Sequence, residues 1–154
     1  MPEINSVAGQ LIGMPLAGPE SFSQQQMDYL KRALGVDETV LWEGTNSFNI
    51  TLSESVFNFS KLKFQMHNSP VLFEVYRADL SSSFNLVGAN IQRDTELYIF
   101  GAVWGISADG ITLTASGRGV GNVKTSSIDY FFSNNASNGG LIKVIGVGRI
   151  AGGN

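Results

Sequence analysis

Residues 41–64, LWEGTNSFNITLSESVFNFSKLKF, contain two runs in which apolar and polar residues alternate. Successive side chains of a strand point to opposite faces, so a period of two predicts strands with one buried face. The polar residues 53–55 fall between the runs and are expected to form the turn that leaves the first strand. The apolar members are Phe48, Ile50 and Leu52 in the first run and Leu62, Phe64 and Met66 in the second.

The same period continues to the end of the chain, and turn-forming residues at 68–70, 109–110 and 138–140 interrupt it. Many short alternating strands separated by such turns predict an all-β fold, an antiparallel β-sandwich over residues 36–154. The expected strands are 39–43, 48–52, 61–67, 71–76, 84–91, 95–104, 111–115, 120–125, 127–132 and 141–150. The expected core residues are Phe48, Ile50, Leu52, Leu62, Phe64, Ile111 and Leu113.

The composition narrows the class of protein. A chain of 154 residues with 43% hydrophobic residues is large enough to bury a core, and 15% charged residues is a low fraction. A net charge of −3 gives no basic surface for nucleic acid, and the absence of cysteine excludes disulfides and thiolate metal sites. The first residues lack the basic start and apolar stretch of a signal peptide, and no apolar run is long enough to enter a membrane, so we expect synthesis in the cytoplasm.

Residues 1–35 differ in character from the rest and are expected to form an attachment or oligomerisation segment. Its first part, residues 1–20, is rich in proline and glycine and predicts an extended arm. This arm is either a loose terminus or a strap laid along a neighbour. The second interpretation rests on its apolar residues, which are Leu11, Ile12, Met14 and Leu16.

A short helix is expected after the arm. Ser23 and Gln26 have the spacing of a capping box, and Gly35 can supply the left-handed residue that ends the helix. The apolar residues Met27, Leu30 and Leu34 are spaced three and four apart, so they share one face. A helix of this length is marginal alone and needs a surface to pack on.

The expected strand 95–104 is apolar on both faces. Leu97, Ile99 and Val103 point one way, whereas Tyr98, Phe100, Ala102 and Trp104 point the other. Either this strand lies between the core and the arm or helix, or one face meets another subunit. We favour the subunit, with Tyr98 and Phe100 in the contact.

The residue types give no convincing active site. His67, the only histidine, falls on the polar face of its strand, and no further imidazole or thiolate can complete a metal site. The glycine clusters at 117–122 and 146–154 do not match a dinucleotide-binding pattern. We therefore expect no enzyme, no metal and no cofactor.

Aromatic, amide and carboxylate residues fall in or near the turns of neighbouring hairpins. Such groups suit sugars, which offer apolar faces and hydroxyls, and they define a candidate carbohydrate-binding group. The alternative is that the aromatic members belong to the core and the asparagines only form turns. The residues are Trp104, Asp109, Tyr130, Asn134, Asn135 and Asn138.

Two segments resemble bacteriophage tail-fibre and receptor-binding proteins. In these proteins a strand that ends in Leu-Trp/Tyr-x-Gly leads to ITLSESxxNF and then to an alternating strand. The segment LIKVIGVGRI at 141–150 is similar to their closing strand. The resemblance therefore extends over residues 39–154 and is carried by the two ends of this range. The matching residues are Leu41, Trp42, Gly44, Ile50, Thr51, Leu52, Ser53, Glu54, Ser55, Asn58 and Phe59.

The resemblance implies a jelly-roll-like sandwich, usually a homotrimer, carried on a virion and without catalytic residues. The partners it implies are further copies of the chain, other virion proteins that hold the N-terminal arm, and a host-surface glycan. Tail fibres usually have long repetitive shafts, which this chain lacks. The alternatives are therefore a capsid decoration or head-fibre protein without receptor binding, and a lectin unrelated to phage. An envelope-degrading enzyme is a further class, which the lack of an active site opposes.

Overall fold

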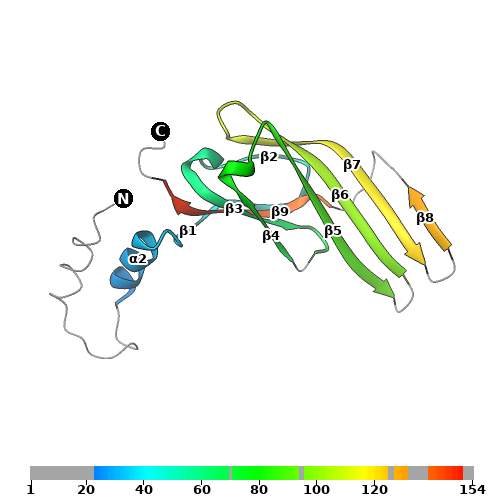
Figure 1. Ribbon diagram of the computed structural model, residues 1–154, viewed down its shortest axis with the longest axis horizontal. Helices are drawn as coiled ribbons and strands as arrows, with labels where there is room; N and C mark the ends of the chain where they lie inside the picture. The colour runs from blue at the N-terminus through cyan, green and yellow to red at the C-terminus, as the bar shows by residue number, and fades with distance from the viewer. Residues whose placement is uncertain (1–22, 70, 94–95, 125–126, 132–138, 151–154) are drawn as a thin grey trace.

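The protein consists of two antiparallel sheets and one short helix, as the alternation predicts (Figure 1). The computed structural model describes residues 23–69, 71–93, 96–124, 127–131 and 139–150. The helical segments are α2 Gln24–Ala33 and the short 3-10 helices η2 Val56–Asn58 and η3 Arg77–Asp79. The strands are β1 Glu38–Ser47, β2 Asn49–Thr51, β3 Phe59–Met66, β4 Leu72–Tyr76, β5 Ser83–Arg93, β6 Glu96–Ile106, β7 Thr112–Lys124, β8 Ser127–Phe131 and β9 Leu141–Arg149.

The strands form a four-stranded sheet in the order β1-β9-β3-β4 and a larger sheet in the order β2-β7-β6-β5, with β8 paired to β7. All of the described strand pairs are antiparallel. Figure 1 shows the long strands β5, β6 and β7 running past the end of the smaller sheet. The prediction of a two-sheet antiparallel sandwich is confirmed.

The core lies between the two sheets, and five of the seven residues expected there are buried: Ile50, Leu52, Leu62, Phe64 and Leu113. The prediction is wrong for Phe48 and Ile111, which are only partly buried. Phe48 connects β1 to β2 at the margin of the core, and Ile111 is in the turn before β7, where its carbonyl accepts the Leu52 N–H at 2.8 Å. The alternation continues through these positions, but the strands do not.

Residues 112–124 form one strand, β7, where the sequence predicts two. The phase of the alternation changes inside it because Ser116 is a bulge: Val103 pairs with Gly117, whereas Trp104 pairs with Ala115. Below the bulge the odd-numbered residues Leu113 and Ala115 pack on the core. A change of phase caused by one extra residue therefore resembles a break between two strands.

Helix α2 has the predicted ends. The Ser23 side chain accepts the Gln26 N–H, while the Gln26 side chain accepts the Ser23 N–H at 2.8 Å, which completes the capping box. Gly35 has a φ of 64°, and the Val36 N–H donates to the Lys31 carbonyl at 2.9 Å, as in a Schellman end. The apolar arm residues Leu11, Ile12, Met14 and Leu16 are outside the described residues.

Strand β6 corrects the expected subunit contact. Phe100, Ala102 and Trp104 face the core and are buried, and Tyr98 packs against it in part. Phe100 is 1% exposed, so it cannot contact another subunit. The face that points away from the core is the other one, which carries Leu97, Ile99 and Val103.

Candidate interaction surface

Trp104 is part of the core and not a platform for sugar. Its side chain is 0% exposed, and its ring stacks on Phe48 with centroids 6.4 Å apart and planes 8° apart. Its indole N–H has no hydrogen-bond partner among the described residues. The carbohydrate-binding role predicted for Trp104 is therefore wrong, because no ligand can reach its ring.

Asp109 and Tyr130, two other members of the sugar group, are not brought together. Asp109 is in the turn before β7, where its carboxylate accepts the Ser107 hydroxyl at 2.5 Å and the Ile111 N–H at 3.0 Å. These bonds hold the pKa of Asp109 below its ordinary value. The backbone of Tyr130 pairs with Gly121, so the rise of a strand places it roughly 30 Å along β7 from the turn. Asn134, Asn135 and Asn138 lie outside the described residues.

The described residues provide no metal centre. Nowhere in this part of the chain do three or more histidine, aspartate or glutamate residues gather closely enough to hold a metal ion. His67 is partly exposed, and its backbone N–H donates to the Gly140 carbonyl at 2.7 Å. Helix α2, the one α-helix described, is too short and too polar to span a membrane.

The residues that carry the phage resemblance have structural roles. Leu41, Ile50, Leu52 and Phe59 belong to the core. A Cβ atom at Gly44 would lie 2.6 Å from the Trp42 ring, so the tryptophan requires a glycine two residues later on the same face. These positions therefore contribute to the fold.

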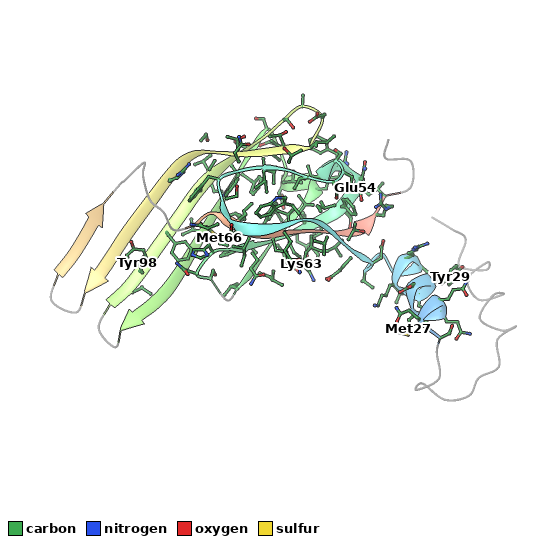
Figure 2. All side chains as sticks on the ribbon, turned by 180° about the vertical axis from the view of Figure 1, so that it is seen from behind. Met27, Tyr29, Glu54, Lys63, Met66 and Tyr98 are labelled. Carbon is green, nitrogen blue, oxygen red and sulfur yellow. The ribbon has the colours of Figure 1, made fainter. Side chains whose placement is uncertain are left out.

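Glu54 and Asn58 join the turn after β2 to the end of β9. The Glu54 carboxylate accepts both terminal nitrogens of Arg149, at 2.6 and 2.7 Å, and the Asn58 amide at 3.4 Å. Figure 2 shows Glu54 at the end of the sandwich that lies nearest to α2. The Arg149 hydrogen bonds, more than that of Asn58, lower the pKa of Glu54.

Replacing Glu54 by glutamine is expected to lower the free energy of unfolding by about 0.5–1 kcal/mol at neutral pH. The effect is small because the ion pair with Arg149 is partly exposed and water screens it. A carboxyl whose pKa is lowered by folding stabilises the native state above its unfolded pKa. This contribution is lost as the pH falls below about 4, so the two proteins should converge in stability there. Urea unfolding at pH 7 and pH 3 measures both differences.

The matched control is Glu43→Gln, which removes a more exposed ion pair with Lys143. We expect it to change the unfolding free energy little at either pH. A gap between wild type and Glu54→Gln that is as large at pH 3 as at pH 7 would contradict the ionic origin of the Glu54 contribution.

Ion pairs cover the outer face of the four-stranded sheet. Ile145 and Val147 of the central strand β9 pair with Lys63 and Lys61 and share their outward face, yet they are only 8% and 4% exposed. Lysine stems can cover apolar surface while their ammonium groups stay in water. The lysine stems therefore shield Ile145 and Val147, whereas Val40 and Leu72 on the same face are 49% and 44% exposed. The ion pairs are Lys61 with Glu74 at 3.0 Å, Lys63 with Glu38 at 2.5 Å and Lys143 with Glu43 at 3.0 Å.

The outer face of the larger sheet has no such cover. Among the described side chains of β5, β6 and β7 the one charge is Arg118, which pairs with buried Ala102 and lies 3.6 Å over the Phe48 ring on the inner side. We call the outer side the uncharged face. Its described residues are Ser83, Asn85, Val87, Ala89, Leu97, Ile99, Gly101, Val103, Gly105, Thr114, Ser116, Gly117 and Gly119.

Helix α2 also presents apolar side chains to the surroundings. None of its residues is buried, and Figure 1 shows it beside one end of the sandwich and away from both sheets. Met27 is 38% exposed and Leu34, at its end, is 73% exposed. The predicted apolar side of the helix is therefore present, but within the described residues the sandwich does not cover it.

No protein family matches this chain when it is compared with family models, and neither the curated proteins nor the solved structures contain a significant match. Two of the apolar surfaces that the described residues leave exposed are the uncharged face and helix α2. Sequence reasoning placed Met27, Leu30 and Leu34 on the second surface. It missed the first, although the two-sided apolar strand 95–104 was its signal.

Proposed function

We propose that this protein is a non-enzymatic structural protein of a bacteriophage particle, of the fibre or head-fibre type, attached through residues 1–35. The observation that carries the proposal is helix α2. It has complete caps at both ends and an apolar side, yet it buries none of its residues. A ten-residue helix is marginal alone and needs a partner surface. A docking site on the particle supplies that surface.

Residues 41–59 and 141–150 resemble tail-fibre and receptor-binding proteins. This resemblance supports a bacteriophage particle, and we propose with it that the chain forms a homotrimer. It also supports a jelly-roll-like topology for the sandwich. The pairing of β1 with β9 and of β2 with β7 agrees with this, because both pairs join strands far apart in the sequence. The β3–β4 hairpin and the β5–β6–β7 meander are local pairings beside them.

The proposal does not extend to host glycan binding. The aromatic residue on which that role depended, Trp104, is buried, and Asp109 lies far along β7 from Tyr130. A structural role in the particle, as in a decoration or head-fibre protein, needs neither residue.

Substitution of the exposed helix residue Leu34 by glutamate tests the attachment. We expect a folded protein with an unchanged melting temperature, because the side chain is 73% exposed, and at least a tenfold loss of the chain from purified particles. An immunoblot of particles from cells that supply the tagged variant measures this. The control is Gln25→Glu, which places the same charge on the opposite side of α2 and should be incorporated normally.

Deleting residues 1–35 should have the same consequence as Leu34→Glu and leave a folded sandwich with a β-sheet circular dichroism spectrum. Normal incorporation of either variant would show that this segment is not the anchor. Absence of the wild-type chain from purified particles would overturn the proposed class of protein.

A further inference from the structure

Helix α2 is joined to the sandwich without a free linker. The last hydrogen bond of the helix end runs from the Val36 N–H to the Lys31 carbonyl at 2.9 Å. The next residue, Asp37, already bonds to β9. Figure 1 shows α2 leading directly into β1 at one end of the sandwich. No residue of this connection is left without contacts to serve as a flexible linker.

Asp37 binds two consecutive residues of β9. Its carbonyl accepts the Gly148 N–H at 2.9 Å, and its carboxylate accepts the Arg149 N–H at 3.4 Å. The sandwich side of these bonds is itself held, because the Arg149 guanidinium binds Glu54 and lies 5.0 Å from the centroid of the Phe59 ring. The connection is therefore bonded to a part of the sandwich that is fixed in place.

Two glycines meet at this connection, Gly35 at the end of the helix and Gly148 of β9. Both have positive φ, at 64° and 66°. A Cβ atom at Gly148 would lie 2.6 Å from the Gly35 carbonyl oxygen and 2.5 Å from the Ser60 hydroxyl. The hydroxyl can rotate away, but the carbonyl is backbone and can move only together with the end of α2. The lack of a side chain at Gly148 therefore lets the helix end pack directly on β9.

We propose that residues 35–37 and 148–149 form a rigid joint, so that α2 and the sandwich move as one body. The consequence of the joint rests on the proposed attachment through α2. A docking site that holds the apolar side of α2 also sets the direction in which the sandwich points. A sandwich that swings on a flexible tether would instead need residues free of such contacts between the two.

Distances between two spin labels test the joint in the purified full-length chain. The chain has no cysteine, so labels attach only to introduced ones. The sites are Gln25→Cys on α2 and Ala108→Cys in the turn before β7, and both positions are exposed. An excess of unlabelled chain restricts the measurement to labels within one molecule. We expect pulsed electron paramagnetic resonance to give a single narrow distance peak.

Asparagine at each of the two glycines gives a matched pair of variants. Asparagine tolerates positive φ, so the two positions differ in the space around them and not in backbone conformation. Nothing lies within 4 Å of a Cβ atom at Gly35, and Gly35→Asn should keep the narrow peak. Gly148→Asn should push the helix end away from β9, so we expect its peak to spread over several distances.

Insertion of two glycines after Gly35 is a second test that leaves β9 unchanged. The inserted residues can still end the helix and Asp37 can still bind β9, but the helix end no longer packs on Gly148. We expect the same spread of distances with an unchanged circular dichroism spectrum. This variant decides the test if Gly148→Asn does not fold.

A broad distribution in the chain with the native joint would overturn the inference. So would a narrow peak that stays at the same distance in the two-glycine insertion, because contacts other than the joint would then hold the helix. Neither result depends on particles. Particle attachment fails by a different observation, the normal incorporation of Leu34→Glu, and the joint can be rigid in a chain that is absent from particles.

Discussion

Truncating Trp104 to alanine is expected to lower the free energy of unfolding by about 3–5 kcal/mol. The side chain is fully buried, and it fills the space between β6 and the Phe48 ring that stacks on it. A cavity left by an indole cannot close without moving both sheets, so the loss includes the contacts as well as the burial. Urea unfolding followed by circular dichroism measures it.

Trp104→Phe is the informative control. It keeps an aromatic ring next to Phe48 and removes the buried indole N–H, which has no described partner. An unpaired buried donor destabilises by about 1–3 kcal/mol, so its removal offsets part of the lost volume. We expect a much smaller loss than for alanine. An alanine variant as stable as wild type would contradict the buried position and restore Trp104 as a surface residue.

Truncating Phe64 to alanine should also lower the free energy of unfolding by about 3–5 kcal/mol. Phe64 of β3 is 0% exposed and stacks on Phe84 of β5, with ring centroids 4.7 Å apart and planes at 28°. The pair joins the two sheets across the core. Thermal and urea unfolding of the variant, with β-structure followed by circular dichroism, measure the effect.

A double-mutant cycle separates the pair from simple burial. If the rings interact directly, the loss in Phe64→Ala/Phe84→Ala should fall short of the sum of the single losses by about 0.5–1.5 kcal/mol. Additive losses would show that each ring contributes only through its own burial, and would contradict the stacking across the sheets.

The sequence alone predicted most of the sandwich, because burial on one face imposes a period of two that local pairing preserves. Strands β3, β4, β5, β6, β8 and β9 fall close to the expected ranges, whereas β1 continues to Ser47. The prediction failed where one residue changes the phase, at Ser116, and where alternation continues beyond a strand, at Phe48 and Ile111. Neither event leaves a mark in residue type that distinguishes it from a turn or a strand.

The candidate surface was harder to predict because it is marked by a lack of charged side chains and not by a motif. The sequence of a strand such as β6 shows that both faces carry apolar residues, but it does not show which face packs on the core. The choice was decided by Phe84 and Leu86 of β5, which are buried on the same side as Trp104 and Phe100. The sequence prediction placed the subunit contact on Tyr98 and Phe100 because the strand is apolar on both faces and the charged fraction is low, whereas Phe100 is buried in the core.

Strand β9 has a consequence for how the molecule is made. It lies between β1 and β3. Its residue Val147 pairs with Glu38 of β1, which is more than a hundred residues earlier in the chain. A growing chain on the ribosome therefore cannot complete the smaller sheet until residues 141–149 have emerged. Until then β1 and β3 have unpaired edges, and closing such distant pairs is slow. The smaller sheet can therefore be completed only after β9 has been synthesised, whereas the β5–β6–β7 meander needs no strand of that sheet for its pairing.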